Sequence, residues 1–264
     1  MKGRIAVFGG IYANHLALDA AIRDARARGA DRILCLGDLG AFGPHPDRTV
    51  DRIRAEGIEV VRGNYDDSLA RGLDDCQCGY TDPRDNHYAR LSYQYTFQNT
   101  SAENRAWMGT LPHEIRFELA GLRVLACHGS PRLMNEFLWE STTPTHFLQH
   151  LGRVHEADVI LATHTGLPWQ RRWGGEQGSG LFVNVGALGR PANDGRPEVW
   201  YALLDPMDGA VDVRFVPVAY DHAALAEEMR SEELPEEFIE TILTGWWTTC
   251  LEILPGKERA RGRF

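Results

Sequence analysis

Four side chains that could bind a metal ion follow short apolar runs of the sequence. Asp38 comes after RILCLG, Asn64 after EVVRG, His128 after RVLAC and His164 after VILAT. Carboxylate oxygen, amide oxygen and imidazole nitrogen are ligands that Mn, Fe and Zn accept. In open sheets built from alternating strands and helices, ligands bind beyond the carboxyl ends of the strands. Each residue alone also fits a helix cap or a structural histidine, but the four together predict one metal site.

The elements that must position these residues can be read from the apolar pattern. The N-terminal part of the chain alternates apolar runs with amphipathic stretches, which predicts a parallel sheet. The ranges expected as strands are 4–10, 31–40 and 58–67, and those expected as helices are 14–29 and 47–57. Asn14 is a candidate cap at the start of the first helix, and Gly29 can end it.

The second half of the chain carries more strands than helices. The ranges expected as strands are 114–121, 122–129, 158–164, 180–187, 198–205 and 211–218. Tight turns at 119–122 and 208–209 separate two pairs of them, which favours mixed or antiparallel pairing. Further helices are expected near Tyr88 and at 101–111, 221–230 and 235–254. We therefore divide the chain into a main domain, 1–220, and a C-terminal helical extension packed on it, 221–264.

Length and composition exclude several classes of protein. The 264 residues fit one large domain, and 43% hydrophobic with 25% charged residues is typical of a globular chain. A net charge of -9 without a basic block argues against a nucleic-acid surface. The apolar runs are shorter than the ~18 residues that span a bilayer. Five cysteines and no recognisable signal peptide favour the cytoplasm and no disulfide framework.

The order of short motifs identifies a family that the chain resembles. GD, GNYD, HGS and HT, followed by NVGALGRP, each come after an expected strand. This series resembles the calcineurin-like metallophosphoesterases, and among them the compact bacterial phosphodiesterases, from Arg4 to about Val218. The resemblance implies an α/β fold of two packed mixed sheets flanked by helices, a four-layer α-β-β-α sandwich. It also implies that one metal ion is bound by Asp38, Asn64, His128 and His164.

The second metal position of the resembled family is incomplete in this chain. The family's N-terminal D-x-H motif corresponds to Gly10 and Tyr12, and the last His of its G-H-x-H motif corresponds to Gly166. Asp38, which would bridge the two ions, is retained. We therefore expect one Mn, Fe or Zn ion per chain. A second ion would need a site rebuilt near Tyr12, with His15 as another candidate ligand.

Loss of one ion would remove a positive charge that two-metal hydrolases use in the transition state. Arg132 and Arg190 are candidate replacements and substrate-binding residues, because a guanidinium clamps phosphate with a fork of donors. Tyr12 is a third candidate, and a surface salt bridge is an equally good interpretation of Arg132. Tyr65 stands where many family members carry a catalytic His. Its phenol can donate a hydrogen bond, and Asp66 could orient it.

Two further segments are candidates for walling the site. Residues 75–87 are rich in turn-forming residues and could fold over it as a lid. Within them, Cys76 and Cys78 could bind a soft metal, form a redox pair or be packed free thiols. Trp139 follows the His128 motif and could stack on a base or ring of the substrate, or anchor its loop to the core.

These observations favour a metal-dependent phosphoester hydrolase, a phosphatase or phosphodiesterase that acts on a small organic phosphate or nucleotide. Two alternatives stay open. The chain could be a binding protein that kept this fold without hydrolysis, because Gly10, Tyr12 and Gly166 replace metal ligands. It could also perform another metal chemistry, such as iron redox chemistry. We expect a small-molecule phosphate as partner, neither nucleic acid nor membrane, and a homo-oligomer by analogy with the family.

Overall fold

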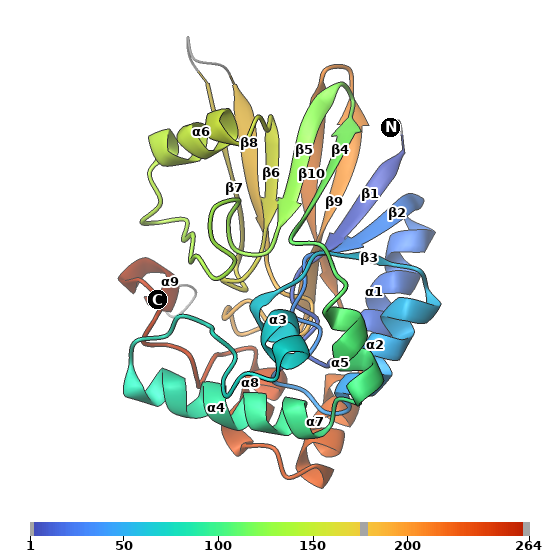
Figure 1. Cartoon of the computed structure of the whole chain (residues 1–264), viewed down its shortest axis with the longest axis vertical. Helices are drawn as coiled ribbons and strands as arrows, with labels where there is room; N and C mark the ends of the chain where they lie inside the picture. The colour runs from blue at the N-terminus through green and yellow to red at the C-terminus, as the bar shows by residue number, and fades with distance from the viewer. Residues whose placement is uncertain (1–2, 175–178, 261–264) are drawn as a thin grey trace.

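Two five-stranded mixed sheets pack against each other at the centre of the molecule (Figure 1). The computed structural model describes residues 3–174 and 179–260 of the chain. The strand order is β10-β9-β1-β2-β3 in the first sheet and β4-β5-β6-β8-β7 in the second. Helices flank both sheets, so the α/β sandwich that the sequence motifs predicted is confirmed.

The first sheet is parallel from β1 to β3 and ends in the antiparallel strands β9 and β10. In the second sheet β5, β6 and β8 are parallel, and β4 and β7 run antiparallel at its edges. The strands are β1 (Arg4–Phe8), β2 (Ala30–Cys35), β3 (Glu59–Val60), β4 (Glu114–Leu119), β5 (Leu122–Cys127), β6 (Val159–Ala162), β7 (Pro168–Trp173), β8 (Gly180–Val185), β9 (Val199–Met207) and β10 (Ala210–Val218).

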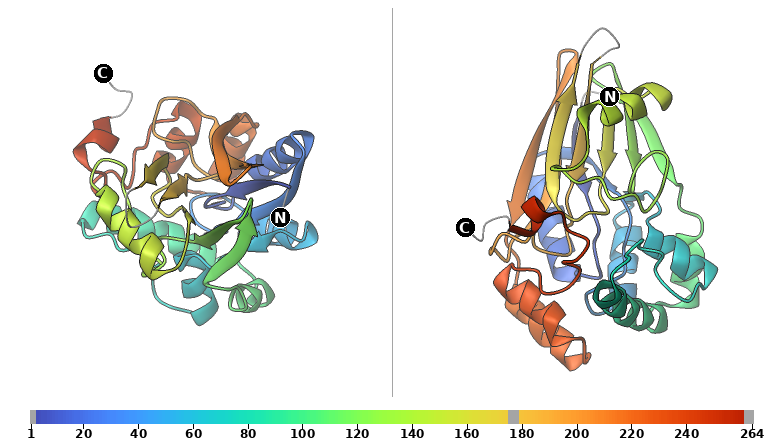
Figure 2. Two further views of the ribbon diagram at one scale, coloured as in Figure 1. Left: turned by 90° about the horizontal axis from the view of Figure 1, so that it is seen from above. Right: turned by 90° about the vertical axis from the view of Figure 1, so that its left-hand side faces the viewer.

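Helices cover the outer face of each sheet. Figure 2 shows α1 and α2 beside the first sheet and α6 beside the second. The helices are α1 (His15–Ala27), α2 (Pro46–Ala55), α3 (Asn64–Arg71), α4 (Pro83–Gln98), α5 (Ala102–Met108), α6 (Thr145–Val154), α7 (His222–Ser231), α8 (Glu236–Thr244) and α9 (Gly256–Ala260). The side chain of Asn14 accepts a hydrogen bond from the amide of Ala17, so it caps α1 as expected.

The alternation of side chains along β1 explains the layering. Ile5 and Val7 belong to the apolar cluster between the sheets, and Ala6 and Phe8 belong to the cluster under the helices. A strand presents successive side chains to opposite faces, so a strand buried on both faces is apolar throughout. Phe238 of α8 joins the same helix-side cluster, which places the C-terminal helices against the main fold.

Three sequence expectations about elements are wrong. The strand expected at 58–67 ends at Val60, because Asn64 already begins α3. The helix expected at 235–254 ends at Thr244, since Gly245 adopts a left-handed φ of 73°. The strand β7 and the helix α6 were not anticipated. The early end of α8 matters most, because it frees the following residues to turn toward the strand ends.

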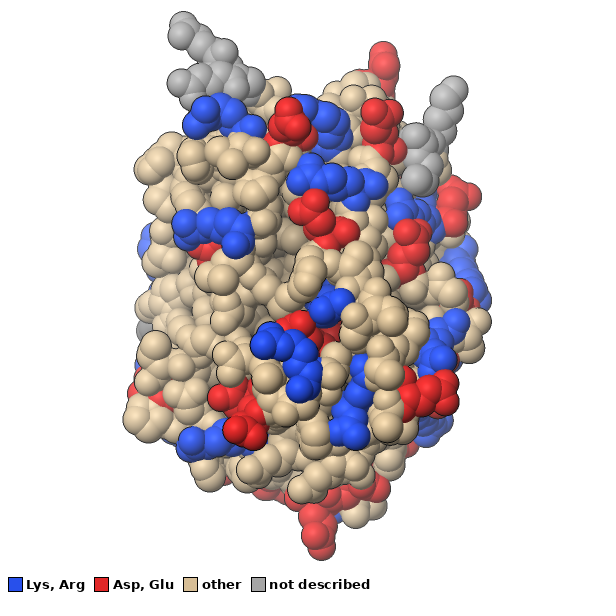
Figure 3. Space-filling model, viewed as in Figure 1, with Lys and Arg blue, Asp and Glu red and all other residues tan. Residues whose placement is uncertain are grey.

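Two further features concern the charges on the surface and the polarity of the helices. Figure 3 shows acidic and basic side chains intermixed over the face in view. Across residues 3–174 and 179–260, no helix is long and apolar enough to cross a membrane.

Candidate metal centre

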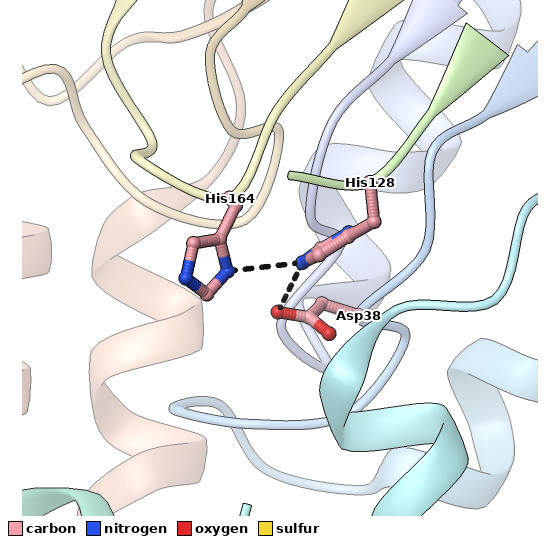
Figure 4. Close-up of side chains that lie close together, drawn as sticks. All are labelled: Asp38, His128 and His164. Carbon is pink, nitrogen blue, oxygen red and sulfur yellow. Dashed lines mark hydrogen bonds and ion pairs between the residues drawn. The ribbon is translucent and has the colours of Figure 1, made fainter. Parts of the chain in front are cut away.

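Asp38, His128 and His164 meet in a buried cluster at the ends of the strands (Figure 4). His128 Nε2 lies 3.2 Å from Asp38 Oδ2 and 3.2 Å from His164 Nδ1. One atom of each residue lies within 4.8 Å of the others, a spacing suited to shared coordination of an ion. In the described part of the chain, no other group of three or more His, Cys, Asp or Glu has this spacing.

The strand order brings these residues together. Asp38 follows β2, His128 follows β5 and His164 follows β6, and the two sheets present these carboxyl ends to one another. The backbones of Asp38 and His164 have positive φ angles, 55° and 62°. Such angles cost a non-glycine residue about 1–3 kcal/mol and gather at functional sites. The fold therefore holds two of the three candidate ligands in unfavourable backbone conformations.

Hydrogen bonding fixes which nitrogen of His128 faces the cluster. Its Nδ1 lies 2.6 Å from the backbone oxygen of Leu36, so Nδ1 carries a hydrogen and donates it. Burial disfavours the charged ring, but Asp38, the Leu36 carbonyl and Asp66 together raise the pKa of His128. Burial, and next the charge of His128, lower the pKa of His164 to about 3. His164 is thus neutral at pH 7, the form in which imidazole binds metals.

Asn64 supplies an acceptor atom whose hydrogen-bonding capacity is unused. Its Nδ2 donates to the backbone oxygen of Cys76 at 2.8 Å. Its Oδ1 is buried and has no partner among the described residues. An unsatisfied buried acceptor costs about 1–3 kcal/mol, which a bound cation would recover. The next residue, Tyr65, donates its amide to Asp38 Oδ1 at 3.0 Å, which fastens the start of α3 to the cluster.

Asp66 positions the loop that carries Asp38. Its carboxylate accepts the backbone amides of Asp38 at 2.9 Å, Leu39 at 3.1 Å and Gly63 at 2.8 Å. Burial, and next the Asp38 carboxylate, raise the pKa of Asp66 to about 6. The hydroxyl of Tyr65 donates to Ser92 Oγ at 3.0 Å. Asp66 therefore does not orient the Tyr65 phenol, contrary to the sequence expectation, because backbone amides take its oxygens.

A cavity of about 50 Å³ opens beside the cluster. A water molecule needs about 10–15 Å³ on this measure, so the space holds a few waters or one small group. Asp38 and His164 line it, and the other lining residues are Tyr12, Ala41, Phe42, Tyr65, Cys78, Tyr80, Tyr88, Ala89, Ser92, Arg190, Phe238 and Cys250. Cys78 and Tyr80 come from the 75–87 segment, which therefore walls the site as the lid hypothesis required.

The two lid cysteines are joined as a disulfide, Cys76–Cys78. This excludes packed free thiols and a soft-metal thiolate pair for this structure, and agrees with a redox pair among the alternatives drawn from the sequence. Cys35 and Cys127 are buried free thiols in the core, as expected. Burial raises the pKa of both thiols, so neither is reactive at neutral pH.

Aromatic rings lie beside Gly10 and Gly166, which stand where the resembled family carries ligands of its second metal ion. A Cβ atom added to Gly10 would lie 2.6 Å from Cζ of Tyr12, so the Tyr12 ring fills the space of a side chain at position 10. A Cβ added to Gly166 would lie 3.4 Å from the ring of Trp247. Burial, and next the Asp38 carboxylate, raise the pKa of Tyr12, which keeps the phenol protonated. His15 faces Glu228 at 2.6 Å instead.

The structure separates the two candidate arginines. Arg132 is largely exposed, and its Nε lies 2.9 Å from Glu136 Oε2, outside the cavity. Arg190 is buried and lines the cavity with Asp38 and His164. Trp139 is buried and stacks on Phe137, whose ring lies 4.4 Å from that of His164.

Some residues of the cavity wall could not be identified from the sequence pattern. Phe42 lies in a loop after Asp38, and Cys250 lies in a segment that helical periodicity misassigned. Tyr80 falls within the lid range but was not singled out. The pairing of Arg132 with Glu136, four residues further on, could have been read from the sequence as a local ion pair.

The chain is similar to known proteins over most of its length. The sequence model of the "Calcineurin-like phosphoesterase superfamily domain" matches residues 4–209. "Uncharacterized protein MJ0912" of Methanocaldococcus jannaschii is 26% identical, over 93% of this chain and 99% of its own length. A metallophosphoesterase crystal structure from Sphaerobacter thermophilus is 27% identical with a TM-score of 0.70, covering 92% of this chain and 99% of that one.

A second solved structure supports the fold alone. Hypothetical protein PH1004 from Pyrococcus horikoshii OT3 is 22% identical with a TM-score of 0.75, over 93% of this chain and 99% of that one. The family match covers well over half of this sequence. The chain therefore belongs to the calcineurin-like phosphoesterase superfamily, whose members carry divalent metal ions. The clustered atoms of Asp38, His128 and His164 fit such an ion, and Asn64 adds a buried acceptor without a partner.

Proposed function

We propose that this protein is a metal-dependent phosphoester hydrolase with one well-formed metal site. The ligands would be Asp38, Asn64, His128 and His164. One observation carries the proposal: Asp38 Oδ2, His128 Nε2 and His164 Nδ1 converge in a buried cluster, and each can accept a bond. Acceptor atoms repel one another in a dry interior unless a cation or a proton lies between them.

The ion site, Tyr65 and the cavity would each have a separate role in hydrolysis. Bound there, an ion of Mn, Fe or Zn supplies Lewis-acid activation of water and of phosphoryl oxygens. The Tyr65 phenol, whose pKa burial raises, stays protonated in the cavity wall, and it would have to give up its bond to Ser92 Oγ to donate to a substrate. The cavity of about 50 Å³ has room for one small group, which favours the phosphoryl group of a small organic phosphate or nucleotide.

A second candidate function is a binding protein that recognises phosphates without hydrolysing them. The rings of Tyr12 and Trp247 beside Gly10 and Gly166 favour it, because residues without ligand atoms replace side chains that would bind a second ion. Two-metal hydrolases clamp both the attacking and the leaving oxygen, and one ion cannot do both. Iron redox chemistry has weaker support, since Tyr12 is a protonated phenol.

Elemental mass spectrometry combined with a phosphoester panel tests the proposal. Protein purified without chelator should hold one equivalent of Mn, Fe or Zn and hydrolyse at least one ester class. His128→Ala should lose both metal and turnover, whereas His146→Ala, an exposed histidine on α6, should keep both. Metal without turnover would favour the binding protein, and no metal after loading would refute the hydrolase and leave the binding protein. A homo-oligomer, a cytoplasmic location and a small-molecule phosphate partner stay predictions.

A further inference from the structure

Arg190 is a buried cation in the wall of the cavity that Asp38 and His164 also line. Only 5% of its surface is exposed. Its Nη2 donates to the backbone oxygen of Thr249 at 2.7 Å, and its guanidinium carbon lies 3.8 Å from the ring centre of Trp247. Among the residues the structure describes, it forms no ion pair with a carboxylate, its guanidinium has the Cys250 thiol as a side-chain partner, and its Nε has no hydrogen-bond partner.

An isolated buried charge is costly. Removing a guanidinium from water costs several kcal/mol unless an opposite charge or a full set of acceptors compensates it. Stacking on Trp247, and on Phe42 at 4.4 Å, recovers part of this cost. The Nε–H group still lacks an acceptor. An arginine in this state is complementary to an anion, and the cavity in front of it is where an anion would enter.

The chain clamps the guanidinium from two segments that lie far apart in the sequence. The indole Nε1 of Trp247 donates to the backbone oxygen of Pro191 at 2.6 Å. The amide of Trp247 donates to Asn193 Oδ1 at 2.9 Å. These bonds fasten segment 246–250 to segment 190–193, and Thr249 then accepts from Arg190. Segment 246–250 lies beyond the part of the chain that the family sequence matches, residues 4–209.

The electrostatics connect this cation to the metal-ligand cluster. The pKa of the Tyr12 phenol responds to Asp38, which raises it, and to Arg190, which lowers it. Tyr12 therefore lies within reach of both charges, with its ring over Gly10. Once the cluster holds an ion, a group between it and Arg190 would meet a positive charge on each side. That arrangement suits a phosphoryl group, which carries its charge on several non-bridging oxygens.

We propose that Arg190, held by segment 246–250, forms an anion subsite that binds the phosphoryl oxygens turned away from the metal-ligand cluster. The subsite rests on the proposed function, because that function brings a phosphate into the cavity. The ligand chemistry is a tetrahedral oxyanion, from a phosphoester substrate or from the free phosphate that hydrolysis releases. The guanidinium supplies a fixed positive charge where a second ion is not coordinated, and its fork of N–H donors can bind two oxygens.

The competing interpretation is that Arg190 only fastens the C-terminal segment. Arg171 provides a matched control, since it stacks over Trp169 at 5.3 Å and donates to the backbone oxygens of Thr143 and Glu140. It has the same kind of fastening contacts but lies outside the cavity. A fastening role would make Arg190→Gln and Arg171→Gln behave alike.

Calorimetric titration of the full chain with inorganic phosphate tests the subsite. Wild-type protein should bind phosphate when loaded with Mn²⁺, and more weakly after chelator treatment. Arg190→Gln and Arg190→Lys should weaken phosphate binding about tenfold or more, because a charge-assisted bidentate contact is lost. Arg171→Gln should match wild type, and the metal content of all variants should be unchanged. Phosphate affinity in Arg190→Gln within twofold of wild type, with only a lowered Tm, would overturn the proposal.

A measurement without substitution covers the case in which Arg190 variants do not fold. In protein labelled with ¹⁵N-arginine, the Arg190 Nε–H resonance should shift on phosphate titration, with or without metal. No shift at saturating phosphate, or no phosphate binding by wild-type protein, would overturn the subsite. Failure of the hydrolase proposal would appear separately, as missing turnover or missing metal in protein that still binds phosphate through Arg190.

Discussion

The ring of Tyr12 stands in the space that a side chain at Gly10 would need. A Cβ built on Gly10 comes within 2.6 Å of Cζ and 3.0 Å of Oη of Tyr12. These two residues replace the aspartate and histidine of the motif that the chain resembles. The two replacements are therefore coupled: the tyrosine ring fits in this place because position 10 has no side chain.

This coupling gives a first prediction. Gly10→Ala should destabilise the protein by about 1–3 kcal/mol, the usual cost of overpacking a filled site. The same change introduced into Tyr12→Ala should cost less than about 0.5 kcal/mol, because the ring is gone. Urea unfolding of the four proteins in this double-mutant cycle measures the difference. Gly174→Ala is the control, since nothing lies within 4 Å of a Cβ there. Equal costs in both backgrounds would contradict the coupling.

The metal-ligand cluster could be predicted from the sequence because its residues follow strands that the apolar pattern reveals. Asp38, His128 and His164 each come within three residues of the end of a strand, and the two packed sheets bring these carboxyl ends together. Patterns of this kind can be recognised in the local sequence without knowledge of the rest of the fold. The same reasoning found the helix cap Asn14 and the hairpin at 119–122.

The surroundings of the cluster could not be predicted in this way. Trp247, Thr249 and Cys250 reach the cavity only because α8 ends at Gly245, whereas the apolar periodicity continues to residue 254. Arg132 and Arg190 both follow a strand-end motif, and only tertiary contacts decide which guanidinium is buried. Such contacts join segments nearly 60 residues apart, for which the sequence carries no local signal.

A second prediction concerns Asp66. Its two carboxylate oxygens accept three backbone amides, so Asp66→Asn turns an NH₂ group toward N–H donors. We expect a loss of about 2–4 kcal/mol in the free energy of unfolding, together with weaker metal binding through a displaced Asp38. Asp67→Asn on the same helix breaks only surface ion pairs with Arg62 and Arg71, and should cost less than about 1 kcal/mol. Indistinguishable urea midpoints would contradict the positioning role.

A third prediction uses the unsatisfied oxygen of Asn64. Metal at 100 times its Kd should raise the free energy of unfolding by about 2.7 kcal/mol in the wild type. Asn64→Ala should lose at least about 1.4 kcal/mol of this gain, which corresponds to a tenfold weaker affinity. Asn86→Ala is the matched control, because its amide also donates to a lid carbonyl, that of Tyr80, at 3.1 Å. An unchanged metal-induced Tm shift in Asn64→Ala would exclude it as a ligand.

A fourth prediction is that Arg132 takes no part in hydrolysis. The Arg132 guanidinium stacks over Phe147 at 4.8 Å and pairs with Glu136, and it is largely exposed. Arg132→Ala should therefore change the free energy of unfolding by less than about 1 kcal/mol. Its kcat and KM for any ester that the protein hydrolyses should stay within about twofold of wild type, a change of about 0.4 kcal/mol. A loss of kcat by tenfold or more would show that Arg132 is catalytic, as the sequence predicted.

A last prediction follows from the tyrosines. The chain has eight, and each has a raised pKa in the folded protein. Burial is the main cause for seven of them, including Tyr93, whose pKa it raises to about 12. For Tyr88 the main cause is the hydrogen bond to Glu237. Lysine contributes little above pH 9, because the sequence contains only two.

The sign of the effect is set by these raised pKa values. The native state retains the phenol protons more tightly than the unfolded chain, whose phenols ionise near pH 10. The resulting stability is fully present below about pH 10 and declines as the pH rises above it, by up to about 1.4 kcal/mol per pH unit for each phenol. Absorbance at 295 nm should therefore stay flat through pH 10, then rise together with loss of circular dichroism. Tyr201→Phe, which removes a phenol bonded to Asp24 at 2.8 Å, should lower the amplitude of that joint transition. Phenols that ionise near pH 10 while the circular dichroism is unchanged would contradict the burial seen here.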